Sequence, residues 1–150
     1  MGPDDDYPYA VFTGMREDPF FQTGQRNIGV LRRRVPRPSL FLHPDDAARE
    51  GLVDGDWARL ETPTGSVVAA IAVRDTMKAG HVRVPHGWWY PELRGEADLA
   101  GAFINSDAVL CDDADEWLDH EQGVPHFKGF PGRLVKLDEP PELSELALTG

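Results

Sequence analysis

Polar and basic side chains that could bind an anion follow an early strand-like run. The stretch Thr13-Gly14-Met15-Arg16 comes after an aromatic and β-branched segment, which is typical of a strand that runs into a turn. The glycine allows a ligand to approach the backbone closely, and the Thr13 hydroxyl and Arg16 guanidinium can bind oxyanions. The pattern indicates an anion contact, although an ordinary strand-to-turn junction has the same composition.

A second polar stretch, Gln22-Thr23-Gly24-Gln25-Arg26-Asn27, lies a little further along the chain. Its side-chain amides and guanidinium, close together in a glycine-containing turn, suit a heterocycle with many hydrogen-bonding groups or a phosphate. A run of arginines follows at Arg32, Arg33, Arg34 and Arg37. For the first three of these arginines we favour a solvated face or an interface with an acidic subunit.

Adjacent aromatic residues form a third candidate cluster in Val84-Pro85-His86-Gly87-Trp88-Trp89-Tyr90-Pro91. A single core face cannot take all of these rings, so we expect some of them to cover a flat ring system or a partner subunit. Two isolated polar residues, Asn105 and Lys128, complete the candidates. Each of them alone is more simply explained as structural.

Signatures of common catalytic and metal sites are absent from the sequence. It has no G-x-x-x-x-G-K-[ST] phosphate loop, no G-x-G-x-x-G turn and no G-x-S-x-G elbow. The histidines are scattered without an i, i+4 pair, so a metal site is disfavoured. The single cysteine, Cys111, excludes an internal disulfide, and acidic neighbours would raise the pKa of its thiol.

Hydrophobic patterning predicts a small β protein that positions these clusters. Strands are expected at 9–13, 39–43, 57–61, 66–74, 81–85 and 132–137, with short helices near 27–33 and from Pro44 to the residue before Gly51. The strands are expected to pair as hairpins in a barrel or sandwich. Residues 86–130 carry little strand signal, and so long a segment in a compact domain is usually functional.

Length and charge limit the classes of protein that the chain can belong to. It has 150 residues, with 15 Lys+Arg and 26 Asp+Glu, which gives 15 − 26 = −11. One domain is expected, and the charge argues against partners such as nucleic acid or an anionic membrane. No apolar run is long enough for membrane insertion, and the acidic start is unlike a signal peptide. We therefore expect a cytoplasmic protein, exported only as part of a complex.

Taken in order, these motifs resemble the C-terminal molybdopterin-dinucleotide-binding domain of the dimethyl-sulfoxide-reductase family of molybdenum and tungsten oxidoreductases. The resemblance extends from Tyr9 to Leu137 and includes further motifs. These are Leu42-His43-Pro44-Asp45-Asp46-Ala47, Thr62-Pro63-x-Gly65 and Pro125-x-Phe127-Lys128-Gly129-Phe130. Two positions depart from the family pattern: Met15 stands where arginine is frequent, and His43 where asparagine is usual.

The resemblance implies a mainly β fold, a double-psi β-barrel with short helices and a long loop, over residues 1–138. An acidic tail follows at 139–150. It also implies a cofactor, molybdopterin guanine dinucleotide, whose molybdenum or tungsten is held mainly by the cofactor and by other domains. The positions that match cofactor contacts are Thr13, Gly14, Arg16, Gln22, Thr23, Gln25, Arg26, Asn27, His86, Gly87, Trp88, Trp89, Asn105 and Lys128.

The resemblance assigns this chain neither a catalytic nor a metal-ligating residue. The chain is therefore expected to hold the cofactor for catalytic domains or subunits, and not to be catalytic alone. One alternative is a barrel without cofactor that acts as a protein-interaction module. Another is a small hydrolase that uses His86 with Glu92 or Asp107 in a closed pocket. The cofactor hypothesis requires its contact residues to converge on one face of the fold.

Overall fold

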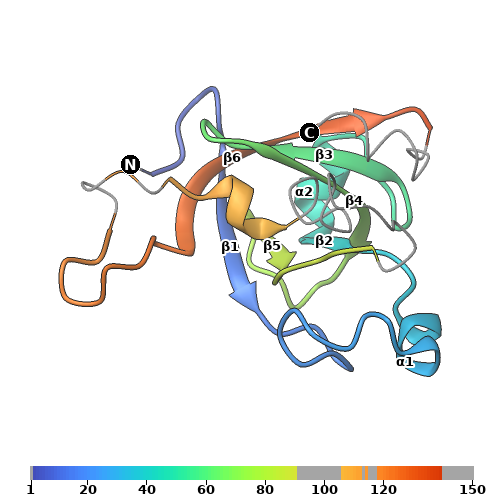
Figure 1. The fold of residues 1–150 in the computed structure, drawn as a ribbon. Coiled ribbons are helices and arrows are strands. Elements are labelled where there is room, and N and C mark those ends of the chain that lie inside the picture. The colour runs from blue at the N-terminus through green and yellow to red at the C-terminus, as the bar shows by residue number, and fades with distance from the viewer. Residues whose placement is uncertain (1, 91–105, 113, 115–117, 140–150) are drawn as a thin grey trace.

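Six strands close into a barrel in the computed structural model, which describes residues 2–90, 106–112, 114 and 118–139. The strand order around the barrel is β1-β5-β2-β4-β3-β6, and β6 returns to pair with β1 (Figure 1). The strands are β1 (Tyr9–Met15), β2 (Ser39–Leu42), β3 (Trp57–Glu61), β4 (Ser66–Val73), β5 (His81–Pro85) and β6 (Lys128–Leu137). The predicted strands are confirmed, with small differences at their ends.

Among the described residues, three short helices lie outside the barrel: α1 (Gly29–Arg34), α2 (Pro44–Arg49) and the 3₁₀ helix η2 (Asp107–Leu110). Pro44 occupies the first turn of α2, where a missing N–H costs nothing. The ring of His43 caps this helix, since its Nδ1 accepts a hydrogen bond from the Asp45 N–H at 3.1 Å. The departure from the family pattern at this position is thus a change of capping residue.

The prediction that the strands pair as hairpins is wrong except for β3 and β4. β1 pairs in parallel with β5, and β2 pairs in parallel with β4. Exchanging β1, β2 and β3 for β4, β5 and β6 leaves every pairing of the barrel in place. This twofold arrangement is the double-psi barrel. Its parallel pairings join strands that are far apart in the sequence, so the turn residues next to each strand do not predict them.

Inward-facing aliphatic side chains fill the barrel. Val11, Leu40, Leu42, Leu60 and Val82 are completely buried, and each alternates with a more exposed neighbour along its strand. Burial of a side chain of this size contributes about 1.5–3 kcal/mol each. In β4 the residues from Val67 to Ala72 are all buried, because this strand is covered on both faces.

The strand ends that carry the candidate residues were the least accurately predicted. β6 begins at Lys128, four residues before the expected start at 132, because Lys128 pairs with Phe12 of β1. β1 continues to Met15, which pairs with Pro85 at the end of β5. In both cases pairing with a neighbouring strand makes the strand longer than its own residues predict. β1 thus continues through Gly14, and β6 includes Gly129.

Candidate functional site

Parallel pairing of β1 and β5 brings three candidate segments to one edge of the barrel. Because the two strands are neighbours and run the same way, both end at this edge. β6 is antiparallel to β1 and therefore starts there, at Lys128. In Figure 1 the β1 arrowhead points downward, and α1 lies below and to the right of the barrel. We call the surface formed by residues 13–16, 22–27, 86–89 and Lys128 the β1–β5 edge.

A buried carboxylate, Asp107, fastens the ends of β1 and β5 together. One of its oxygens accepts the Gly87 N–H at 2.7 Å, and the other accepts the Gly14 N–H at 3.1 Å. The second oxygen also lies 2.9 Å from Nδ1 of His86. Asp107 is only 1% exposed, so these bonds replace the water that a carboxylate would otherwise keep. The side chain thereby fixes the relative position of two candidate turns.

The stretch 22–27 packs directly against the turn after β5. A Cβ added at Gly87 would lie 2.0 Å from Cγ2 of Thr23 and would force that side chain to move, and the φ of +57° is one that glycine favours. The indole N–H of Trp89 donates to the Thr23 carbonyl oxygen at 2.5 Å. These contacts bring the second and third candidate clusters together.

Arg26 lies beneath this contact and is 1% exposed. Its Nη2 donates to the carbonyl oxygen of His86 at 2.7 Å and its Nε to that of Gly87 at 3.3 Å. The guanidinium lies 4.3 Å from the centroid of the buried Trp88 ring and 4.6 Å from that of Phe20. Burial lowers the pKa of Arg26 to about 10. Arg26 and Trp88 therefore support the edge from inside.

Other candidates face outward and suit an anionic dinucleotide. Arg16, Thr23, Gln25, Asn27 and Lys128 are exposed. Within the described part of the chain, the side chains of Gln25, Asn27 and Lys128 have no hydrogen-bond partner. Gln22 and Gln25 have positive φ angles of 54° and 71°, conformations that side chains other than glycine seldom adopt and that cluster at functional sites. The donor set thus fits a cofactor with phosphates and a polar heterocycle.

Asn105 lies outside the described residues, so its predicted contact has no structural counterpart here. Asp107 entered the sequence analysis only as a possible partner of His86 in a hydrolase. The spacing of Asp107 from Gly14 and Gly87 in the sequence does not indicate that its carboxylate binds their amides, because the segments that carry these three residues meet only in the folded barrel. Glu17, buried next to Arg16, was not singled out at all.

The hydrolase alternative receives only part of the geometry it requires. The contact between His86 and Asp107 is present, but the carboxylate is also engaged by two backbone amides. Burial, more than acidic neighbours, raises the pKa of the Cys111 thiol to about 11, which makes it a poor nucleophile. In the described ranges, no group of three His, Cys, Asp or Glu side chains could hold a metal ion. No described helix is long and apolar enough to cross a membrane.

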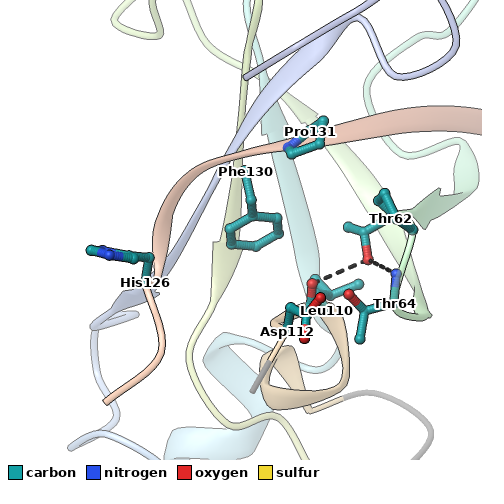
Figure 2. A pocket seen from close by; sticks show the side chains of 8 residues that line it. Thr62, Thr64, Leu110, Asp112, His126, Phe130 and Pro131 are labelled. Carbon is teal, nitrogen blue, oxygen red and sulfur yellow. Dashed lines mark hydrogen bonds between the residues drawn. The ribbon is translucent and has the colours of Figure 1, made fainter. Parts of the chain in front are cut away.

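A separate small pocket lies between the β3–β4 turn, η2 and β6 (Figure 2). Its volume is about 80 Å³, and Leu110, Phe130 and Pro131 line much of it. The Thr62 hydroxyl closes one side by donating to the Leu110 carbonyl oxygen at 3.1 Å. Ligand pockets usually measure about 300–1,000 Å³, so this one is too small for a pterin dinucleotide.

Comparisons with known proteins give relatives that share this region. Residues 11–131 match the family model described as "Molydopterin dinucleotide binding domain". Acetylene hydratase of Syntrophotalea acetylenica is 38% identical over 133 residues, which cover 87% of this chain and 18% of the relative. Trimethylamine-N-oxide reductase of Haemophilus influenzae is 32% identical over 99 residues, covering 63% of this chain and 12% of the relative.

The solved structure of acetylene hydratase from Pelobacter acetylenicus matches with a TM-score of 0.82 and 36% identity. The match covers 88% of this chain and 19% of that one. This chain therefore spans less than a fifth of the length of acetylene hydratase.

These matches confirm the expected role and cofactor. The region is the cofactor-holding domain of molybdenum oxidoreductases and their relatives, and the cofactor is molybdopterin guanine dinucleotide. In the matched relatives it is a small part of a much larger polypeptide. With a match over most of its length, this chain belongs to the molydopterin dinucleotide binding domain family.

Proposed function

We propose that this chain holds molybdopterin guanine dinucleotide across the β1–β5 edge. The observation that carries the proposal is the convergence of residues 13–16, 22–27 and 86–89. The buried carboxylate of Asp107 joins the first segment to the last, and hydrogen bonds of Arg26 and Trp89 join the second to the last. The segments that this framework holds carry exposed guanidinium, ammonium and amide side chains. When bound, the cofactor supplies the metal-centred chemistry, and the residues of this chain bind and orient it.

The candidate residues divide into contacts and supports. Arg16 and Lys128 offset the charge of the pyrophosphate. The polar side chains of the 22–27 stretch bind the heterocycle, and the Trp89 ring covers part of that heterocycle. The contact set is Arg16, Gln22, Thr23, Gln25, Asn27, His86, Trp89, Asn105 and Lys128. The supports are Thr13, Gly14, Arg26, Gly87 and Trp88.

The supports act by holding the edge in place. The Thr13 hydroxyl lies 3.2 Å from the Phe127 carbonyl oxygen, to which it donates. The amide groups of Gly14 and Gly87 donate to Asp107. Because these donors are already engaged inside the protein, they position the turns and leave the cofactor to the exposed groups.

We further infer that the chain is not catalytic alone and works with catalytic domains or subunits of a molybdenum or tungsten enzyme. The small share of each relative that it covers supports this inference. The reducing cytoplasm is the proposed compartment, with export only as part of a complex, because the single cysteine leaves no disulfide to stabilise the fold.

Pterin content tests the proposal. The full chain, with any polypeptide that stays bound to it, would be purified from a host that makes the cofactor, and pterin would be released and quantified by fluorescence. We expect pterin in the wild-type protein and at least tenfold less pterin in the double variant Arg16→Gln/Lys128→Gln. This loss requires the cofactor to bind the variant more weakly by about 1.4 kcal/mol or more. Arg59→Gln, an exposed arginine on β3, is the control. A folded, pterin-free wild-type protein would favour the interaction-module alternative.

A further inference from the structure

A groove with an arginine-rich lining runs along the outside of the barrel next to the β1–β5 edge. Its volume is about 740 Å³, and it extends over β2 and β5 between α1 and the end of β4. Four guanidinium groups line it, those of Arg34, Arg37, Arg74 and Arg83, against the two carboxyl groups of Glu17 and Asp18. A local excess of positive charge on a chain with a net charge of −11 favours an anionic ligand.

The walls of the groove are partly flat and apolar. The Phe41 ring contacts two guanidinium groups, with its centroid 4.7 Å from Cζ of Arg83 and 5.9 Å from Cζ of Arg74. Val35 and Pro36 add apolar surface. The groove has the size of a small-molecule site, about 300–1,000 Å³, and planar guanidinium and apolar surfaces suit a flat heterocycle.

Glu17 distinguishes between the anionic ligands that could occupy the groove. It lines the groove and is only 7% exposed. Its Oε2 and the Nε of Arg83 are both buried and have no hydrogen-bond partner among the described residues. A partly unsatisfied carboxyl group here would repel a wholly acidic peptide, whereas it suits a ligand that carries both phosphate and N–H donors.

We propose that the groove binds a phosphorylated heterocycle through its 2-amino-4-oxopyrimidine edge, with Glu17 accepting the two adjacent N–H groups and the arginines contacting phosphate. Guanine and pterin share this edge, whereas cytosine does not, because it presents an acceptor where guanine has its ring N–H. The proposal rests on the proposed function, since both ends of the cofactor carry the edge. Arg83 joins the groove to the β1–β5 edge by donating to the Arg16 carbonyl oxygen at 2.6 Å.

Calorimetric titration of the full, cofactor-free chain with GDP, CDP and 6-carboxypterin tests the proposal. We expect GDP or the pterin to bind at least about tenfold more tightly than CDP, the range for one lost hydrogen bond to a charged group. Glu17→Gln should abolish this preference, because its amide N–H₂ opposes a ligand donor. Glu121→Gln, the same change at an exposed position in a loop, should keep it.

The arms of this experiment also identify which end of the cofactor is bound. Preference for GDP assigns the groove to guanine, and preference for 6-carboxypterin assigns it to the pterin. Equal binding of GDP and CDP, no binding of any probe, or a GDP preference that survives Glu17→Gln would each overturn the proposal. If Glu17→Gln does not fold, the wild-type protein labelled with ¹⁵N is titrated with the same probes. The amide chemical-shift changes should then centre on Glu17, Phe41 and Arg83.

Failure of this proposal can be separated from failure of the proposed function. Pterin content of the purified protein reports the β1–β5 edge, whereas nucleotide preference reports the groove. Protein that contains pterin but binds GDP and CDP equally would contradict only the groove. Protein that lacks pterin in a producing host would contradict the function of the edge.

Discussion

Asp107 is a buried charge whose role is to join turns rather than to react. Its two oxygens accept hydrogen bonds from the amides of Gly14 and Gly87, and one of them also meets His86. Since an ionised carboxylate can only accept, Nδ1 of His86 must carry the proton in this contact. Nε2 of a neutral His86 is then left as an acceptor.

Replacement of Asp107 should loosen both turns. We expect Asp107→Ala to reduce the free energy of unfolding by about 2–5 kcal/mol, because it leaves two amide donors without an acceptor. Asp107→Asn should cost less and should shift the His86 proton from Nδ1 to Nε2. Chemical denaturation measures the first effect, and nitrogen NMR of the imidazole measures the second. An unchanged tautomer in Asp107→Asn would contradict the assignment.

Glu17 is expected to make the protein less stable at neutral pH than at acidic pH. Burial raises its pKa from 4.5 to about 7, although Arg26 and Arg83 oppose the shift. Between these two pH values the folded state binds the proton and the unfolded state does not, so stability falls as pH rises and levels off above pH 7. The shift corresponds to about 3 kcal/mol.

Glu17→Gln should therefore raise the melting temperature at pH 8 and leave it nearly unchanged at pH 4. The exposed Glu121→Gln should change neither value. Thermal melts of the three proteins across this pH range test the expectation. Equal stabilisation by Glu17→Gln at both pH values would show that packing, and not ionisation, is responsible.

At the scale of elements, the turn after β5 depends on close approach to the 22–27 stretch. Gly87→Ala should destabilise the fold through both its φ of +57° and a clash with Thr23 Cγ2. Gly80→Ala is the matched control, because Gly80 has a φ of +77° with no atom within 4 Å of an added Cβ. Removing the Thr23 methyl group in Gly87→Ala/Thr23→Ser should restore part of the loss, as measured by denaturation. Equal losses for Gly87→Ala and Gly80→Ala would contradict the contact.

Local sequence signals predicted the elements better than their partners. The Pro44 start of α2 and the Pro63-Thr64-Gly65 turn between β3 and β4 obey short-range rules, so both were predicted correctly. The parallel pairings of β1 with β5 and of β2 with β4 depend on closure of the whole barrel, which no local window contains. The hairpin prediction failed for this reason.

At the scale of the whole molecule, net charge is a poor guide to where charge lies. The sequence shows the arginines near residues 32–37, but Arg74 and Arg83 join Arg34 and Arg37 only because β4 and β5 lie beside β2. The sequence motifs singled out residues 13–16, 22–27 and 86–89, and these segments lie together in the folded barrel. They did not distinguish the exposed Arg16 from the buried Arg26, because burial depends on the packing of segments from across the chain.

The location of the cofactor is the central claim, and amide shift mapping tests it most directly. The cofactor-free chain, labelled with ¹⁵N, would be titrated anaerobically with molybdopterin guanine dinucleotide. The shifts are predicted to concentrate on Gly14, Gln25, Gly87 and Lys128, at the β1–β5 edge. Shifts concentrated instead around Thr62 and Phe130, at the small pocket of Figure 2, or no shifts in a folded protein, would contradict the account.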